Sequence, residues 1–179
     1  MLRFFRLADA APGKVPAGAL RLRLTFDERS RSRLATMSAA GTAVAIMLPR
    51  GSVLRDGAVL EGDGGAFAVI EAAPQPLARV TAGSMLQLLR IVYHLANRHV
   101  PAQIAEHAVL IERDPVLERM ALNLGARVEH VEQPFEPEAG AYHEAGHAHA
   151  HGSEPDGPAR SIGEELSIAA HRDRSGAPR

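Results

Sequence analysis

The chain has 179 residues, of which 46% are hydrophobic and 23% charged, a composition that predicts an ordinary globular protein. Its 20 basic and 21 acidic residues leave a formal net charge of -1. This balance argues against nucleic acid or an anionic membrane as a partner, because both attract proteins with a positive excess. The chain has no cysteine, which excludes disulfides, thiolate nucleophiles and cysteine-based metal sites. A transition metal would therefore bind through imidazole, carboxylate or backbone groups.

The N-terminal run MLRFFRLADAAPG is apolar only in part, because Arg3 and Arg6 interrupt it. It is too short for the hydrophobic region of a signal peptide, and no later stretch approaches the length of a membrane span. A cytoplasmic location is therefore the default expectation.

Residues 1–75 are expected to form a small β-rich domain. The run 20–26 alternates apolar and polar side chains with a period of two, which is typical of a strand with one buried face. After a polar turn at 27–30, further short strands are predicted near 34–37, 43–48, 59–60 and 67–70, separated by turn residues. This pattern indicates a β-sandwich or barrel-like unit. It contains no catalytic triad, phosphate loop or ligand cluster, so we expect a scaffold or docking surface.

Two prolines within residues 72–76 predict a linker, and the pattern changes beyond it. Residues 77–132 read as strand, helix, strand, strand, helix and strand. Ser84 is a plausible N-cap for a helix over 85–97, and Asp114-Pro115 predicts the start of a second helix that ends at Gly125. This order is that of a ferredoxin-like domain over residues 76–142, so the fold class is α+β.

Residues 143–179 are rich in Gly, Ala, His and Pro without an apolar period, which predicts a flexible, disordered tail. Nine histidines are present in the chain, and the segment 143–151 holds four of them: His143, His147, His149 and His151. Imidazoles at such spacing can converge on one ion if the backbone folds around it. A solvated low-complexity tail without a specific role explains the composition equally well, so the tail alone leaves both readings open.

His94 and His99 lie near the end of the first predicted helix, in YHLANRHVP. A spacing of five residues places them about 140° apart on a helix, so they do not face one ion together. Periodicity alone favours a surface or packing role for His94 and a helix C-terminal cap for His99. A single exposed histidine holds a metal ion weakly, whereas a two-fold axis would bring two copies of it to one point. Glu136 and Glu138 are expected to be solvated, and no catalytic residue is predicted.

Three segments together resemble one family. YHLANRHVP at 93–101 is similar to the HLGNRHxP motif of the urease accessory protein UreE family, with Ala96 in place of the glycine. QPFEPEAGAY at 133–142, followed by the histidine-rich segment, resembles the end of that family's metal-binding domain, and 31–51 resembles its N-terminal domain. The resemblance covers residues 18 to 151. Residues 111–115 lack the additional histidine pair that some members carry.

The resemblance implies a homodimeric nickel metallochaperone, not an enzyme, that delivers nickel to urease with other accessory proteins, including a GTPase. It also implies that the N-terminal domain is a peptide-binding β-fold. The central ligand would be His99, paired with its symmetry mate, and the expected shell is completed from the tail by His143, His147, His149 and His151. Copper or zinc could occupy such a site in vitro. The alternative is a peptide-binding or chaperone-like adaptor in urease maturation whose metal binding is incidental.

Overall fold

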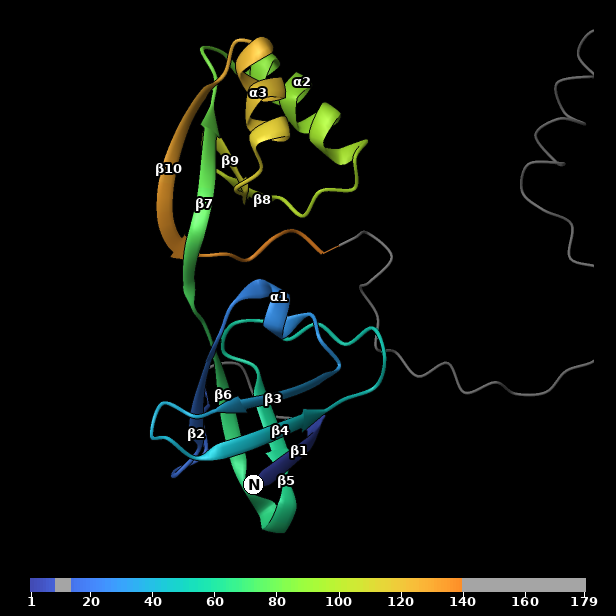
Figure 1. Ribbon diagram of the computed structural model, residues 1–179, viewed down its shortest axis with the longest axis vertical. Helices are drawn as coiled ribbons and strands as arrows, with labels where there is room; N and C mark the ends of the chain where they lie inside the picture. The colour runs from blue at the N-terminus through green and yellow to red at the C-terminus, as the bar shows by residue number, and fades with distance from the viewer. Residues whose placement is uncertain (9–13, 140–179) are drawn as a thin grey trace, which may run out of the picture. The chain divides into compact units, whose positions relative to one another are not determined.

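The computed structural model describes residues 1–8 and 14–139, and their strands form two separate sheets (Figure 1). The predicted flexible tail, 143–179, lies outside the described residues. The first domain contains β1 (Leu2–Leu7), β2 (Leu20–Leu24), α1 (Phe26–Arg29), β3 (Arg33–Met37), β4 (Ala43–Met47), β5 (Val59–Gly62), a 3-10 turn (Asp63–Gly65) and β6 (Phe67–Ala72). The second contains β7 (Pro74–Thr81), α2 (Met85–Ala96), β8 (Gln103–Ala105), β9 (Ala108–Glu112), α3 (Pro115–Asn123) and β10 (Arg127–Pro134).

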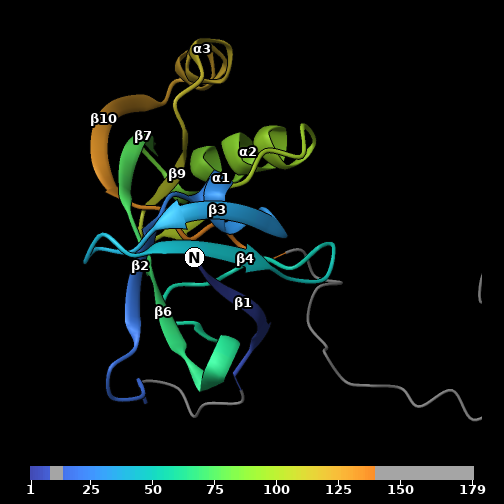
Figure 2. The ribbon, with the colours of Figure 1, turned by 60° about the horizontal axis from the view of Figure 1, so that its bottom comes forward.

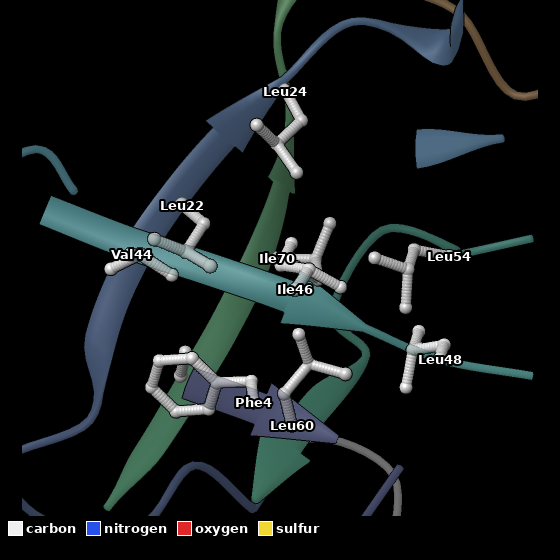
Figure 3. Close-up of a cluster of buried hydrophobic side chains, with 10 residues drawn as sticks. Phe4, Leu22, Leu24, Val44, Ile46, Leu48, Leu54, Leu60 and Ile70 are labelled. Atoms are coloured by element: carbon white, nitrogen blue, oxygen red, sulfur yellow. The ribbon is translucent and has the colours of Figure 1, made fainter. Parts of the chain in front are cut away.

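The first domain is built on one mixed sheet of six strands in the order β2-β6-β5-β1-β4-β3. Its core is a single cluster of buried apolar side chains that includes Leu22 and Leu24 of β2 together with Val44 and Ile46 of β4 (Figure 3). Because β2 and β4 lie near opposite edges of the sheet, their side chains can share one core only if the sheet curls around it. The expected sandwich or barrel-like unit is therefore one curled sheet.

The strand β1 was not predicted, because its two arginines hide its alternation. Phe4 is fully buried in the core, whereas Arg3 and Arg6 lie on the surface and pair with acidic residues near β5. The register of β1 against β5 shifts between Phe4 and Arg6, and such a bulge changes the alternation of side chains. A bidentate hydrogen bond from the Arg3 guanidinium lowers the pKa of the Asp63 carboxyl.

The second domain confirms the predicted order of strand, helix, strand, strand, helix and strand. Its four strands pair antiparallel in the order β10-β7-β9-β8, and α2 and α3 lie on the same side of this sheet (Figures 1 and 2). Both predicted caps are present. The Ser84 hydroxyl accepts a hydrogen bond from the Gln87 amide at 3.3 Å, and the Asp114 carboxylate accepts one from the Val116 amide at 2.8 Å.

The linker predicted over residues 72–76 is wrong. β7 begins at Pro74, so only Ala73 separates it from β6. The prolines are tolerated because β9 joins β7 only from Leu77 onward, which leaves Pro74 and Pro76 with a single strand neighbour. Gln75 between them is buried, accepts a hydrogen bond from the Phe26 amide at 2.8 Å and donates to the Glu112 carboxylate at 2.9 Å.

A second tie between the two domains involves the segment after β10. Arg29 of α1 is 1% exposed, and its guanidinium donates to the Leu54 carbonyl at 2.9 Å, to the Phe135 carbonyl and to the Glu136 carboxylate. The expectation that Glu136 is solvated is therefore wrong. A buried guanidinium requires such partners, because burying a charge without them is costly. These contacts hold residues 135–136 against the first domain.

Candidate metal centre

The helix α2 ends in a left-handed residue, His99, whose φ is 54°. The His99 amide donates to the Ala96 carbonyl at 2.9 Å, and the next amide, of Val100, lies 3.5 Å from the Leu95 carbonyl. Together these two bonds form a Schellman motif, in which His99 occupies the position that glycine most often takes. The expectation that His99 acts at the helix end through its ring needs correction, since it is the backbone of His99 that closes the helix.

The imidazole of His99 takes no part in that closure. The residue is exposed, and among the described residues its ring makes no hydrogen bond or ion pair. A left-handed conformation is unfavourable for a residue with a Cβ atom by about 1 kcal/mol, although histidine is found there more often than most residues. The fold thus places an unengaged imidazole at a position where glycine would be the more stable choice.

An apolar groove of about 220 Å³ adjoins the end of α2. It brings together side chains from the helix, from the strand β8 and its approach, and from the last described residues of the chain: Val92, Ala96, Val100, Ala102, Ile104, Glu138 and Ala139. Since His99 lies between Ala96 and Val100 in sequence, this groove is the immediate neighbour of its backbone. The described part of the chain therefore ends in the groove next to His99.

The helix α2 is apolar on two faces. Leu88, Ile91 and Leu95 are buried in the domain core, as helical spacing requires. A second series remains exposed: Met85, Leu86, Leu89 and Tyr93, with exposed fractions of 52% to 64%. A helix that is apolar on an exposed face indicates a surface for a partner.

The other described histidines have surroundings of their own. His94 is half-buried, with its ring centroid 5.6 Å from that of Tyr93. His107 occupies the turn between β8 and β9 with a φ of 59°, and His130 contacts the Glu118 carboxylate at 2.8 Å. Within residues 1–8 and 14–139, no group of three or more His, Asp or Glu side chains could hold a metal ion. Within the described residues, His99 is therefore not part of a ready-made cluster of metal ligands.

The four tail histidines predicted as ligands, His143, His147, His149 and His151, lie outside the described residues. The structure does describe the residues that precede this segment. The Glu136 amide donates to the Gln103 side chain at 2.9 Å, and the Glu138 amide donates to the Ala102 carbonyl at 2.9 Å. These bonds hold the end of the described chain beside β8.

The exposed apolar stripe of α2 could have been predicted from the sequence. Apolar residues at 86, 89 and 93 repeat at helical spacing beside the series 88, 91 and 95, so the sequence itself contains two apolar stripes. The groove gives no such signal, because its lining comes from segments that are distant along the chain.

Comparison with known protein families matches both domains. Residues 7–73 match the N-terminal domain of UreE urease accessory protein, and residues 75–159 match its C-terminal domain. A urease accessory protein UreE of Ralstonia nicotianae is 50% identical over 133 residues, which cover 74% of this chain and 63% of that protein. Urease accessory proteins UreE of Burkholderia ambifaria and Burkholderia lata are 50% and 49% identical over 146 residues, or 82% of this chain and 70% and 68% of theirs.

The match thus spans less than two thirds of the Ralstonia protein and slightly more than two thirds of the two Burkholderia proteins. In the described residues, no helix is both long and apolar enough to cross a membrane. The comparisons therefore agree with the division into two domains that the two sheets show.

Proposed function

The chain belongs to the urease accessory protein UreE family, and from this membership and the geometry of His99 we propose that it is a nickel-binding metallochaperone. Family membership implies a role in urease maturation. The proposal adds that the chain binds nickel as cargo and delivers it to urease in the cytoplasm, together with other urease accessory proteins that include a GTPase. The observation that carries it is the exposed imidazole of His99 in a conformation that favours glycine.

A homodimer would supply the second imidazole. The exposed apolar stripe of α2, with Leu86, Leu89 and Tyr93, supports an interface, since its burial would remove apolar area from water. A two-fold axis at the end of α2 would pair this stripe with its own copy and bring the two His99 side chains to one point. Two imidazoles from two subunits then form a bridging site that one subunit lacks.

The remaining ligands would come from the tail. His143 is four residues beyond Ala139, which lines the groove beside His99. Four residues span at most about 14 Å, so the tail imidazoles are tethered within reach of the bridging site. Such tethering raises their local concentration, and weak ligands then act together. The four proposed tail ligands are His143, His147, His149 and His151, and a site built from imidazole also accepts copper or zinc in vitro.

Nickel calorimetry on the full chain tests the bridging ligand. His99→Ala is expected to weaken the tightest site by about a hundredfold or more, because both copies of the imidazole are lost. The matched control is His107→Ala, since His107 is also exposed and also has a positive φ. Equal nickel affinity in His99→Ala and the wild type would sink the assignment of His99.

Two further variants test the dimer and the tail. Leu89→Glu with Tyr93→Glu should produce a monomer in sedimentation experiments and weaken nickel binding at the same time, because charges on the stripe prevent its burial. Truncation after residue 142 should reduce the number or affinity of bound ions while the circular dichroism of the two domains stays unchanged. A truncated protein that binds as many ions equally tightly would exclude a ligand role for the tail.

A further inference from the structure

The arginines of the first domain differ in whether they have an acidic partner. Nine arginines lie between residues 1 and 72, and seven of them make an ion pair with a carboxylate: Arg3, Arg6, Arg21, Arg23, Arg29, Arg31 and Arg55. The other two, Arg33 and Arg50, make no ion pair with the residues that the structure describes. They lie far apart in the sequence, and yet both line the same hollow in the surface.

This hollow, the arginine groove, has a volume of about 620 Å³. Such a volume lies within the range of sites that bind small molecules. The groove is formed by two segments, one that joins α1 to β3 and one that follows β4. Its lining residues are Ser30, Arg31, Ser32, Arg33, Leu48, Pro49 and Arg50. None of them is acidic, so the groove has a cationic lining.

Backbone hydrogen bonds hold the two sides of the arginine groove in place. The Leu48 amide donates to the Ser32 carbonyl at 2.7 Å, which joins the two segments directly. The turn that contains Arg50 is closed by Ser52, whose amide and hydroxyl both donate to the Pro49 carbonyl, at 3.3 Å and 2.8 Å. The fold therefore fixes the backbone around the groove, while the arginine side chains remain exposed.

The third arginine of the groove, Arg31, is held only weakly. It pairs with Asp27, one helical turn earlier, and both side chains are more than half exposed. Exposed pairs of this kind contribute little in water, so an anion in the groove can compete for the Arg31 guanidinium. Three guanidinium groups thus border one hollow in a chain whose formal net charge is -1. A general attraction of anions to the whole protein is therefore not expected.

We propose that the arginine groove binds a small molecule that carries two linked phosphate groups. Arginine binds phosphate through paired hydrogen bonds, and each terminal phosphate offers about two negative charges on three oxygens. A carboxylate has one charge and two oxygens, which is too little for three guanidinium groups on both sides of the groove. The donors are side chains from two distant segments, so this site has no phosphate-loop motif in the sequence. It does not depend on the proposed nickel centre.

Isothermal titration calorimetry of the full chain with inorganic pyrophosphate tests the proposal. The protein is first passed over a chelating resin, because pyrophosphate also binds metal ions. The expected result is a one-to-one complex with an affinity at least about tenfold higher than that for sulfate or citrate. Equal affinity for sulfate or citrate overturns the proposal, because weak binding of any anion or of carboxylates would then explain the data.

Adenosine diphosphate is the second probe, because it carries the same linked phosphates on a nucleoside. Tighter binding of adenosine diphosphate than of pyrophosphate supports the proposal and identifies a nucleotide as the ligand. Tighter binding of pyrophosphate supports it and identifies an inorganic phosphate chain. If neither compound binds, the proposal is wrong.

Protein variants locate the site. Arg33→Gln with Arg50→Gln should weaken pyrophosphate binding at least about tenfold, because two of the three guanidinium groups are lost. The matched control is Arg119→Gln with Arg127→Gln, which removes the same charge from two exposed arginines of the second domain and should leave the affinity unchanged. Circular dichroism checks the folding of each variant. Unchanged affinity in the first variant, or an equal loss in the control, contradicts the proposal.

A variant that strengthens binding provides a test in the opposite direction. Asp27→Asn removes the carboxylate that competes for Arg31 and should tighten pyrophosphate binding about twofold. In the Arg33→Gln and Arg50→Gln background the same substitution should not restore the affinity of the wild type. Weaker binding of pyrophosphate by Asp27→Asn than by the wild type would contradict the proposal.

Discussion

The two helices of the second domain end in the same way but with different residues. At the end of α3 the Gly125 amide donates to the Leu122 carbonyl at 2.9 Å and the Ala126 amide donates to the Ala121 carbonyl at 3.0 Å. The end of α2 has the same pair of bonds, with His99 in the place of Gly125. Both residues are left-handed, with φ values of 83° and 54°. The backbone motif is shared, so the difference lies in the side chain.

At Gly125 both the positive φ and the neighbouring Gln87 side chain disfavour a residue with a Cβ atom. A Cβ atom there would lie 2.3 Å from the Gln87 side-chain nitrogen, which donates a hydrogen bond to the Leu124 carbonyl at 2.8 Å. At His99 no contact among the described residues calls for an imidazole, and the side chain is exposed. The comparison shows that the stability of the folded chain accounts for glycine at position 125. It does not account for histidine at position 99, so the reason for this residue must lie in something that its side chain binds. Nickel binding is the explanation proposed above.

The largest expected effect is at the glycine. Gly125→His should destabilise the protein by about 2–3 kcal/mol, because a left-handed residue with a Cβ atom is unfavourable and the new side chain displaces Gln87. Urea unfolding followed by circular dichroism measures the change. A loss of unfolding free energy below about 0.5 kcal/mol would mean that either helix end accepts histidine or glycine. The difference between Gly125 and His99 would then not indicate a role for the His99 side chain.

A smaller effect is expected at Gln87 itself. Gln87→Ala removes hydrogen bonds to the Leu124 carbonyl and the Gly83 amide and should reduce the free energy of unfolding by about 1 kcal/mol. It also opens the space beside Gly125, so Gly125→Ala should be less harmful in this background than in the wild type. A double-mutant cycle measures this coupling. Strict additivity would show that the crowding at Gly125 is unimportant and that its φ alone demands glycine.

The smallest effect, and one of opposite sign, is expected at the end of α2. His99→Gly should leave the metal-free protein as stable as the wild type or more stable by up to about 1 kcal/mol, because glycine adopts positive φ without strain. Urea unfolding without metal provides the measurement, and His99→Ala, which keeps a Cβ atom, is the control. A clear destabilisation by His99→Gly would show that the imidazole has a structural role.

Patterns of neighbouring residues predicted most of the helices and strands. These predictions succeeded where a few residues close together in the sequence determine the element. The caps at Ser84 and Asp114 and the end of α3 at Gly125 follow from residue type, so the sequence alone placed both helices. The left-handed conformation of His99 has no such signal, because histidine is not a typical residue for that position. Its choice as a site residue came from the family resemblance together with the idea of a two-fold axis.

Errors arose where partners are distant along the chain. Glu136 looked solvated because Arg29, which binds it, is 107 positions away. The segment 72–76 looked like a linker because proline usually ends strands, whereas here β7 lacks a second neighbour at that point. The exposed stripe of α2 was not predicted, because periodicity identifies apolar stripes but does not tell which of two stripes faces the core.

Unfolding of the wild type and of His99→Gly, each with and without nickel, tests most directly whether His99 is present for its side chain. Nickel at about a hundred times its dissociation constant should stabilise the wild type by about 2.7 kcal/mol. The same nickel concentration should stabilise His99→Gly far less, although the metal-free variant is at least as stable as the wild type. An equal nickel-dependent gain in both proteins would contradict the account, because the imidazole at the end of α2 would then have no part in holding the metal.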